Sequence, residues 1–116
     1  MDDTLDPRQR RTRRALADAI LAIARERSVG DVTMTSLAKE AGVHRTTLYQ
    51  HVRSPTELLS EVLRAELDDV RDANLLVGDL TSLPGAIRTA ILGVLDHLER
   101  HAVIYRRELA NPSSPL

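Results

Sequence analysis

Polar, hydrogen-bonding side chains are concentrated in residues 41–55, AGVHRTTLYQHVRSP. Leu48 and Val52 are four residues apart and supply the inner face of a helix. At about 100° of rotation per residue, the polar side chains fall on the opposite side and the flanks of that helix, namely Thr46, Thr47, Tyr49 and Gln50. Their groups donate and accept hydrogen bonds, so this face is either an ordinary solvated surface or a binding surface.

Gly42 indicates how the chain positions this face. Thr33 is placed to cap a short helix whose Leu37, Ala38 and Ala41 share one side, and Gly42 follows directly. A glycine just past a helix end takes the left-handed conformation that lets the chain turn without a Cβ clash. Two short helices joined in this way are typical of a helix-turn-helix, in which the second helix enters the DNA major groove.

A long amphipathic helix is predicted before this pair. Asp6 and Pro7 fit the N-cap and the first helical position, with a start near Thr12 as the alternative. The helix runs to about Arg27, and spacings of three and four place one apolar face inward: Leu16, Ala19, Ile20, Ile23 and Ala24.

Charge is distributed unevenly along the 116 residues, whose net charge is -1. Residues 1–53 carry a balance of +3 and residues 54–116 a balance of -4. Five arginines form a basic arm at the start of the chain: Arg8, Arg10, Arg11, Arg13 and Arg14. Such an arm is either a solvated tail or an electrostatic contact to a polyanion, and the arm alone leaves both open.

The C-terminal half is predicted to contain further helices. Ser54 and Pro55 start one that runs to about Ala73, with Glu57 placed to complete the cap. Its apolar stripe is Leu58, Leu59, Val62, Leu63, Leu67 and Val70. After the looser segment NLLVGDLTSLPG, another helix has the apolar face Ala86, Ile87, Ala90, Ile91, Val94, Leu95 and Leu98. We expect this face to be core, with a pocket wall or a dimer surface as alternatives. Residues 101–110 begin a last helix that stops before Asn111 and Pro112.

The sequence contains little that indicates catalysis or metal binding. The absence of cysteine excludes disulfides, thiolate metal sites and cysteine nucleophiles. His97 and His101 have a spacing that can hold a metal. We nevertheless expect neither a metal nor a cofactor, because no third ligand is spaced to join them and exposed histidines are common. Tyr105 is interpreted as a packing residue, and no catalytic residues are assigned.

The ordered elements resemble a known DNA-binding domain. The run from about Arg13 to Leu63, RRALADAILAIARERSVGDVTMTSLAKEAGVHRTTLYQHVRSPTELLSEVL, is similar without a gap to the N-terminal domain of the tetracycline-repressor (TetR) family. The matching pieces are ILAIARERSV, TMTSLAKEAGV and TLYQHVRS. The resemblance implies a domain that binds an operator as a dimer, with a larger helical C-terminal domain that dimerises and holds an inducer pocket.

The resemblance also implies a set of DNA contacts. Base or phosphate contacts are expected from the start of the second short helix, phosphate anchors from its end, and one contact from the first short helix. The expected residues are Thr33, Thr35, His44, Arg45, Thr46, Thr47, Tyr49, Gln50, His51 and Arg53. Hydroxyl groups suit phosphate oxygens, and an arginine can bind guanine through two parallel hydrogen bonds.

Several positions depart from the family pattern. His44 stands where serine is common, so the helix is capped differently or His44 itself contacts the DNA backbone. Val52 replaces an aromatic anchor, and Pro55 replaces a lysine whose phosphate contact Arg53 could take over. The chain is also much shorter than usual for the family, so we expect a truncated second domain without the helices that normally form the dimer.

The sequence therefore predicts an all-α protein: a three-helix domain containing a helix-turn-helix, then a long linking helix and part of a helical ligand-binding and dimerisation domain. Residues 1–54 form the first domain and residues 55–116 the second. We expect a cytoplasmic bacterial transcriptional regulator that binds double-stranded DNA as a homodimer and responds to a small apolar effector. The alternative is a short interaction module that pairs with a longer regulator and binds DNA weakly alone. Nothing favours an enzyme, and no membrane association is expected.

Overall fold

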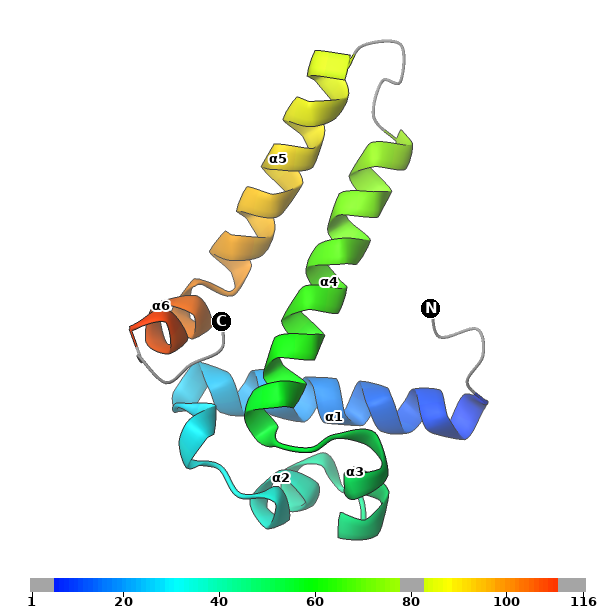
Figure 1. Cartoon of the computed structure of the whole chain (residues 1–116), viewed down its shortest axis with the longest axis vertical. Coiled ribbons are helices and arrows are strands. Elements are labelled where there is room, and N and C mark those ends of the chain that lie inside the picture. The colour runs from blue at the N-terminus through cyan, green and yellow to red at the C-terminus, as the bar shows by residue number, and fades with distance from the viewer. Residues whose placement is uncertain (1–5, 78–82, 111–116) are drawn as a thin grey trace.

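The structure of the chain is a computed structural model that describes residues 6–77 and 83–110, with residues 73–77 and 83 described by their backbone alone. All regular structure in these ranges is helical, as predicted. The elements are α1 (Pro7–Glu26), a 3-10 helix (Val29–Asp31), α2 (Met34–Ala41), α3 (Arg45–His51), α4 (Pro55–Val77), α5 (Leu83–Arg100) and α6 (Ala102–Leu109). In Figure 1, α4 and α5 lie side by side on one side of α1, and α2 and α3 lie on the other.

Side-chain caps fix the starts of the helices. Asp6 accepts a hydrogen bond from the backbone N–H of Gln9 at 2.8 Å, and the Gln9 side chain accepts from the N–H of Asp6 at 3.2 Å. This reciprocal pair starts α1 at Pro7 rather than near Thr12. The predicted caps of α2 and α4 are also present, with Thr33 Oγ1 accepting at 3.0 Å and Ser54 Oγ at 3.1 Å.

One continuous apolar core joins the helices around α1. The predicted inner face of α1 is buried over its whole length. It packs against Leu37 of α2, Leu48 of α3, and Leu59 and Leu63 of α4. Ile104 of α6 belongs to the same cluster. Because the start of α4 contributes to this core, any displacement of α4 acts directly on the packing beneath α2 and α3.

Two hydrogen bonds tie α6 to the last turn of α1 and to the 3-10 helix that follows it. The buried carboxylate of Glu108 accepts from the backbone N–H of Val29 at 3.4 Å. Arg107 Nη1 donates to the carbonyl oxygen of Ala24 at 2.7 Å. The last described helix is thus attached to the N-terminal unit, and its range agrees with the predicted helix over residues 101–110. Asn111 and Pro112, predicted to end it, lie outside the described residues.

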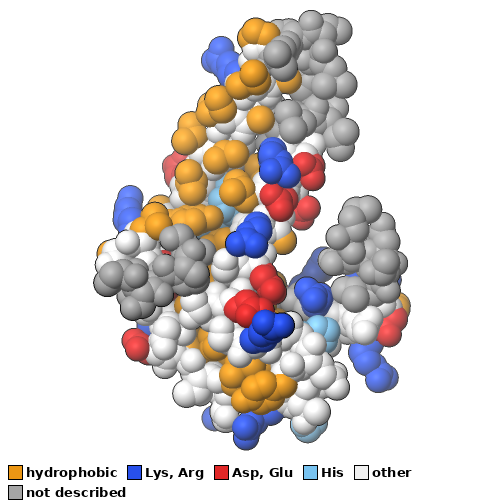
Figure 2. Space-filling view, in the orientation of Figure 1, with side chains coloured by type: hydrophobic (Ala, Val, Ile, Leu, Met, Phe, Trp, Pro, Cys, Tyr) orange, Lys and Arg blue, Asp and Glu red, His pale blue; other side chains and the backbone are white. Residues whose placement is uncertain are grey.

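The prediction that the apolar face of α5 is core is wrong for half of that face. Ala86 is buried and Ala90 and Val94 are half-buried, as expected for a side packed on α4. The larger residues are exposed instead: Ile87, Ile91, Leu95 and Leu98, together with Leu92. The apolar arc is too broad for one neighbouring helix to cover, and no other helix in the described ranges lies over it. Figure 2 shows hydrophobic side chains gathered along α5.

The two histidines expected to be exposed, His97 and His101, are instead buried. His97 is fully buried and His101 is 5 % exposed. His97 lies on α5 and His101 is the N-cap residue of α6. A third candidate ligand, Glu66, comes from α4 and approaches both rings. Glu66 could not be predicted as a partner from the sequence, because helical spacing relates only residues within one helix and Glu66 lies 31 positions before His97. None of the described helices combines the length and apolar character needed to cross a membrane.

Candidate nucleic-acid interface

The turn between α2 and α3 has the geometry that its sequence requires. Gly42 has φ 71° and ψ 32°, in the left-handed region, and is the C-cap of α2. The N–H of Val43 donates to the carbonyl oxygen of Ala38 at 3.0 Å, which closes the end of the helix. The chain can therefore begin α3 at Arg45, only three residues after the glycine.

Apolar anchors fix the orientation of α3. Leu48 is completely buried and Val52, directly after the helix, is 5 % exposed. Val43 is half-buried at the entry to the helix and packs against the same core. With the inner side held at both ends, the opposite side of α3 must face solvent. Valine at position 52 is sufficient for this anchoring, although the resemblance leads one to expect a larger aromatic residue there.

Most of the predicted DNA-contacting residues lie on the exposed surface. On α3 and at its ends, His44, Arg45, Thr46, Tyr49, Gln50 and Arg53 are exposed, while Thr47 and His51 are half-buried. Tyr49 is the most conspicuous, with 54 % of its surface accessible despite its large ring. Within the described residues, the side chains of Arg45, Tyr49 and Gln50 form no hydrogen bond or ion pair. Their polar groups are therefore available to an external partner.

Two predicted residues have more specific local environments. Thr33 is exposed, and its hydroxyl oxygen accepts the capping bond of α2, which leaves the hydroxyl hydrogen free to donate outward. Thr35, one helical position further, is also exposed. His44 is the N-cap residue of α3 but makes no side-chain capping bond. The second short helix thus begins without the side-chain cap that serine would supply.

The basic arm is part of α1 and lies beside the end of α3. All five of its arginines are exposed and form no ion pair within the described part of the chain. Arg10 and Arg14 line an open groove of about 630 Å³ together with His51. The opposite wall of the groove belongs to α4, with Glu61 and Asp69. The basic arm is evident in the sequence, but its position beside α3 is not, because only the fold brings the first turns of α1 next to α3.

An exposed polar helix, a glycine turn behind it and a basic segment at its side define a helix-turn-helix DNA-binding protein. Residues 16–62 match the family model described as bacterial regulatory proteins, tetR family. This match identifies residues 16–62 as a TetR-type DNA-binding domain and supports a DNA-binding transcriptional regulator of that kind. Proteins of this kind are regulators and generally not enzymes. No curated protein gives a significant match to the chain.

Proposed function

We propose that the protein is a repressor that binds a palindromic operator as a dimer and dissociates from it when a small effector binds. Residues 1–54 are assigned to DNA binding, and residues 55–116 to the linking helix and the part that senses the effector and pairs the subunits. The observation that carries the proposal is the outer side of α3, where polar side chains are held outward by a completely buried Leu48 and are engaged by no described residue.

On DNA, α3 is the recognition helix of this proposal. Arg45, Thr46 and Thr47 approach base edges and phosphates at its first turn, while Gln50 faces the groove one turn later. An arginine bound bidentately to guanine contributes about 1 to 3 kcal/mol of discrimination against the wrong base. The remaining contacts hold the phosphate backbone, and their loss weakens binding to every sequence alike. They are assigned to Thr33, Thr35, His44, Tyr49, His51 and Arg53.

The arginines of the arm supply attraction that does not depend on sequence. Their exposed guanidinium groups lie along the first turns of α1, and four of them, Arg10, Arg11, Arg13 and Arg14, line the same groove as His51. Neutralising phosphates releases counterions, so log affinity should fall linearly with log salt, by about 0.9 for each phosphate contacted.

Pairing of two chains is assigned to the exposed side of α5. A two-fold operator requires two recognition helices about 34 Å apart, one turn of DNA. Ile91 and Leu95 are each more than half exposed and one helical turn apart, as in a helix that packs on a second helix. The same aliphatic residues offer an apolar effector a surface that competes with pairing, which gives release a physical basis.

The first test is selection of bound duplexes from a random DNA library by the purified chain, sequenced at low salt. Enrichment of a palindrome is the expected result. A single enriched half-site would contradict dimeric binding but keep α3 as the recognition helix, whereas no enrichment would contradict the proposal.

A variant set then tests the assigned face on the enriched duplex. Replacing Arg45, Thr47 and Tyr49 together by alanine should abolish specific binding in a fluorescence anisotropy titration, with far-ultraviolet circular dichroism unchanged. Arg88→Ala is the matched control, since Arg88 is an exposed arginine on α5 and should leave affinity unaltered. Unchanged binding by the triple variant would refute the recognition face.

A second candidate function is favoured by the exposed side of α5. In this alternative the chain pairs through that surface with a longer regulator and binds little DNA alone. Sedimentation equilibrium of the purified chain separates the two: a self-associating dimer supports the repressor, and a monomer that gives no duplex enrichment supports the interaction module.

A further inference from the structure

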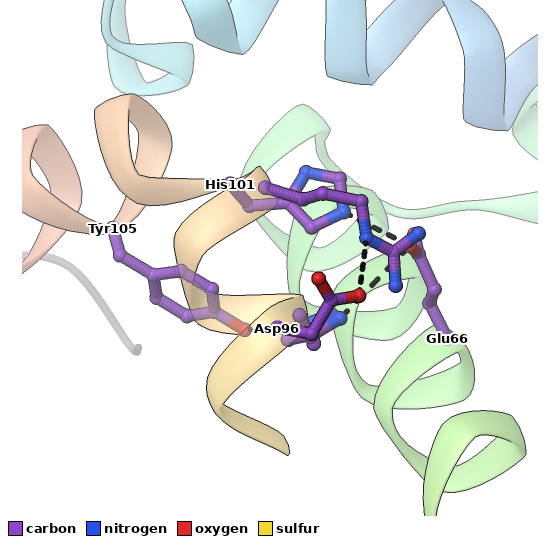
Figure 3. Close-up of polar contacts among 6 residues, drawn as sticks. Glu66, Asp96, His101 and Tyr105 are labelled. Atoms are coloured by element: carbon purple, nitrogen blue, oxygen red, sulfur yellow. Dashed lines mark hydrogen bonds and ion pairs between the residues drawn. The ribbon is translucent and has the colours of Figure 1, made fainter. Parts of the chain in front are cut away.

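A buried polar cluster lies between α4, α5 and α6, away from the DNA-binding surface. It consists of Glu66 from α4, His97 from α5, His101 at the start of α6, and Tyr105 from α6. Figure 3 shows Glu66 reaching from α4 towards His101, and it shows Tyr105 on α6, whose hydroxyl lies within hydrogen-bond distance of His97. The proposed DNA contacts do not use any of these residues.

The distances show how closely the three donor residues converge. His101 Nε2 lies 3.0 Å from Glu66 Oε1, and His97 Nδ1 lies 3.9 Å from the same oxygen. One donor atom from each residue lies within 4.8 Å of the other two. In a tetrahedral zinc site with bonds of about 2.0 to 2.1 Å, two ligand atoms are about 3.3 Å apart, so only small side-chain movements would bring all three atoms onto one ion.

Hydrogen bonding leaves nitrogen atoms of the cluster without partners. His97 Nε2 and the hydroxyl of Tyr105 are 2.8 Å apart. We assign the proton to Nε2, which donates to the tyrosine oxygen, so that Nδ1 presents a lone pair towards Glu66. Neither His97 Nδ1 nor His101 Nδ1 has a hydrogen-bond partner among the described residues, although both are buried. A buried unpartnered nitrogen is costly, and an ion held beside Glu66 would satisfy the one that approaches this carboxylate, His97 Nδ1.

The groups that hydrogen-bond to the three proposed ligands are also of the kind found around metal sites. A histidine ligand usually donates its other ring N–H to a fixed acceptor, which orients the ring and sets its tautomer. In the tautomer assigned to His97, its Nε2–H donates to the hydroxyl oxygen of Tyr105, which is the acceptor. Arg100 Nη1 approaches Glu66 Oε1 at 3.3 Å, but its side chain is half exposed and also pairs with Asp96 at 3.3 Å. The arginine can therefore move to Asp96 and solvent when a cation takes its place.

The protonation states of these groups follow from their surroundings. Burial is the largest influence on the pKa of Glu66 and raises it, but the hydrogen bond and charge of His101 and the charges of His97 and Arg100 outweigh burial and hold the pKa below its usual value. Burial and then the charge of His101 lower the pKa of His97. Burial, assisted by Glu66, raises the pKa of Tyr105.

We propose that Glu66, His97 and His101 form a binding site for a divalent transition-metal ion of the zinc class. Two imidazoles and one carboxylate form a donor set suited to zinc, whereas magnesium and calcium prefer sites built from oxygen alone. Three protein ligands leave the fourth tetrahedral position for water or a small ligand. The site does not depend on the proposed repressor function, because it is defined by residues that the DNA surface does not use.

Occupancy would cross-link α4 to α5 and α6. The start of α4 is part of the core beneath the recognition helix, and α6 is bonded to the end of α1. An ion that binds the folded chain and not the unfolded chain raises the midpoint of thermal unfolding, by an amount that grows with the logarithm of the free ion concentration divided by the dissociation constant. This shift gives a readout that is independent of DNA.

The test is a zinc titration of the full chain, prepared without a histidine tag and freed of metal with a chelator. Isothermal titration calorimetry should show one ion per chain. Glu66→Gln and His97→Gln should each weaken the affinity by more than about a hundredfold, since loss of a group that only hydrogen-bonds to a ligand already costs about ten- to a hundredfold. Tyr105→Phe is the milder variant and should fall in that ten- to hundredfold range.

The chain provides a matched control, because it has only four histidines and the other two, His44 and His51, lie at the ends of α3. The double variant His44→Gln, His51→Gln should keep full zinc affinity. Failure of the wild-type chain to bind zinc would overturn the proposal, as would binding that survives Glu66→Gln and Tyr105→Phe or that disappears in the control. X-ray absorption of the zinc-loaded wild type should show two imidazole ligands, and a spectrum without them would equally overturn the site.

Discussion

α3 and α5 expose opposite kinds of side chain. α3 buries a leucine and presents threonine, tyrosine and glutamine to solvent, in the ordinary manner of an amphipathic helix. α5 buries His97 and Ala86 against α4 and presents Ile91 and Leu95 to solvent. The first arrangement is complete in a single chain and leaves hydrogen-bonding groups for a polar partner. The second arrangement leaves apolar side chains in water unless an apolar partner covers the helix. We therefore assign pairing to α5.

The largest effect is expected when the exposed side of α5 is made charged. Replacing Ile91 and Leu95 by lysine places two ammonium groups in an apolar interface, and each costs several kcal/mol there. The dimer dissociation constant should rise by at least about a thousandfold, since about 1.4 kcal/mol corresponds to tenfold. Sedimentation equilibrium measures this constant, with Glu26→Lys on α1 as the control. Dimerisation of the double variant at wild-type strength would exclude this side of α5 as the interface.

Two leucine-to-alanine substitutions, one on α3 and one on α5, should differ in their effect on the free energy of unfolding. Leu48→Ala should lower the free energy of unfolding by about 2 to 5 kcal/mol, because it leaves a cavity under α3. Leu95→Ala removes the same atoms from a position that is 54 % exposed. In dilute protein its cost should stay within about 0.5 kcal/mol. Urea unfolding of the two variants measures both values, and equal costs would mean that α5 is covered within the single chain.

The turn that orients α3 is expected to tolerate little change. Gly42→Ala should destabilise the chain by about 1 to 2 kcal/mol, the cost of a side chain in the left-handed conformation. The effect is conformational, since an added Cβ at Gly42 has no described atom within 4 Å. Gly30→Ala is the control: its Cβ would make only an ordinary contact of 3.7 Å with Ser28 Oγ. Thermal unfolding should separate the two, and a neutral Gly42→Ala would contradict the strained turn.

The smallest effect is a gain in stability. His44→Ser should add the side-chain cap that α3 lacks and stabilise the chain by about 1 kcal/mol. The same change should weaken DNA binding if His44 contacts the phosphate backbone as assigned. Denaturation and anisotropy measured on one preparation test both outcomes, and a loss of stability would contradict the expected gain from an added serine cap.

Local signals were sufficient to predict the DNA-binding half. The caps at Thr33 and Ser54, the left-handed Gly42 and the inner face of α1 follow from residues close together in sequence, and the structure confirms all of them. The DNA contacts themselves stay predictions, although the structure places most of those side chains on the surface. On α5 the apolar pattern correctly predicted a helix but could not tell which part of the arc meets α4.

The burial of His97 was hidden for a related reason. It depends on Glu66 and Tyr105, which come from two other helices, and on alanines that let α5 approach α4 closely. A hydrophobic pattern predicts that a histidine is exposed, whereas a hydrogen-bonding partner on another helix allows the histidine to be buried. Hydrogen bonds between residues on different helices produce no periodic pattern in the sequence.

The bond between Val29 and Glu108 makes one amide proton a reporter on a distant part of the chain. The backbone N–H of Val29 is buried, and its acceptor lies 79 residues further along the sequence. Exchange of this proton with heavy water requires that the carboxylate withdraw, which happens when α6 leaves the end of α1. Its exchange rate therefore measures how often the C-terminal helix undocks, recorded from within the DNA-binding half.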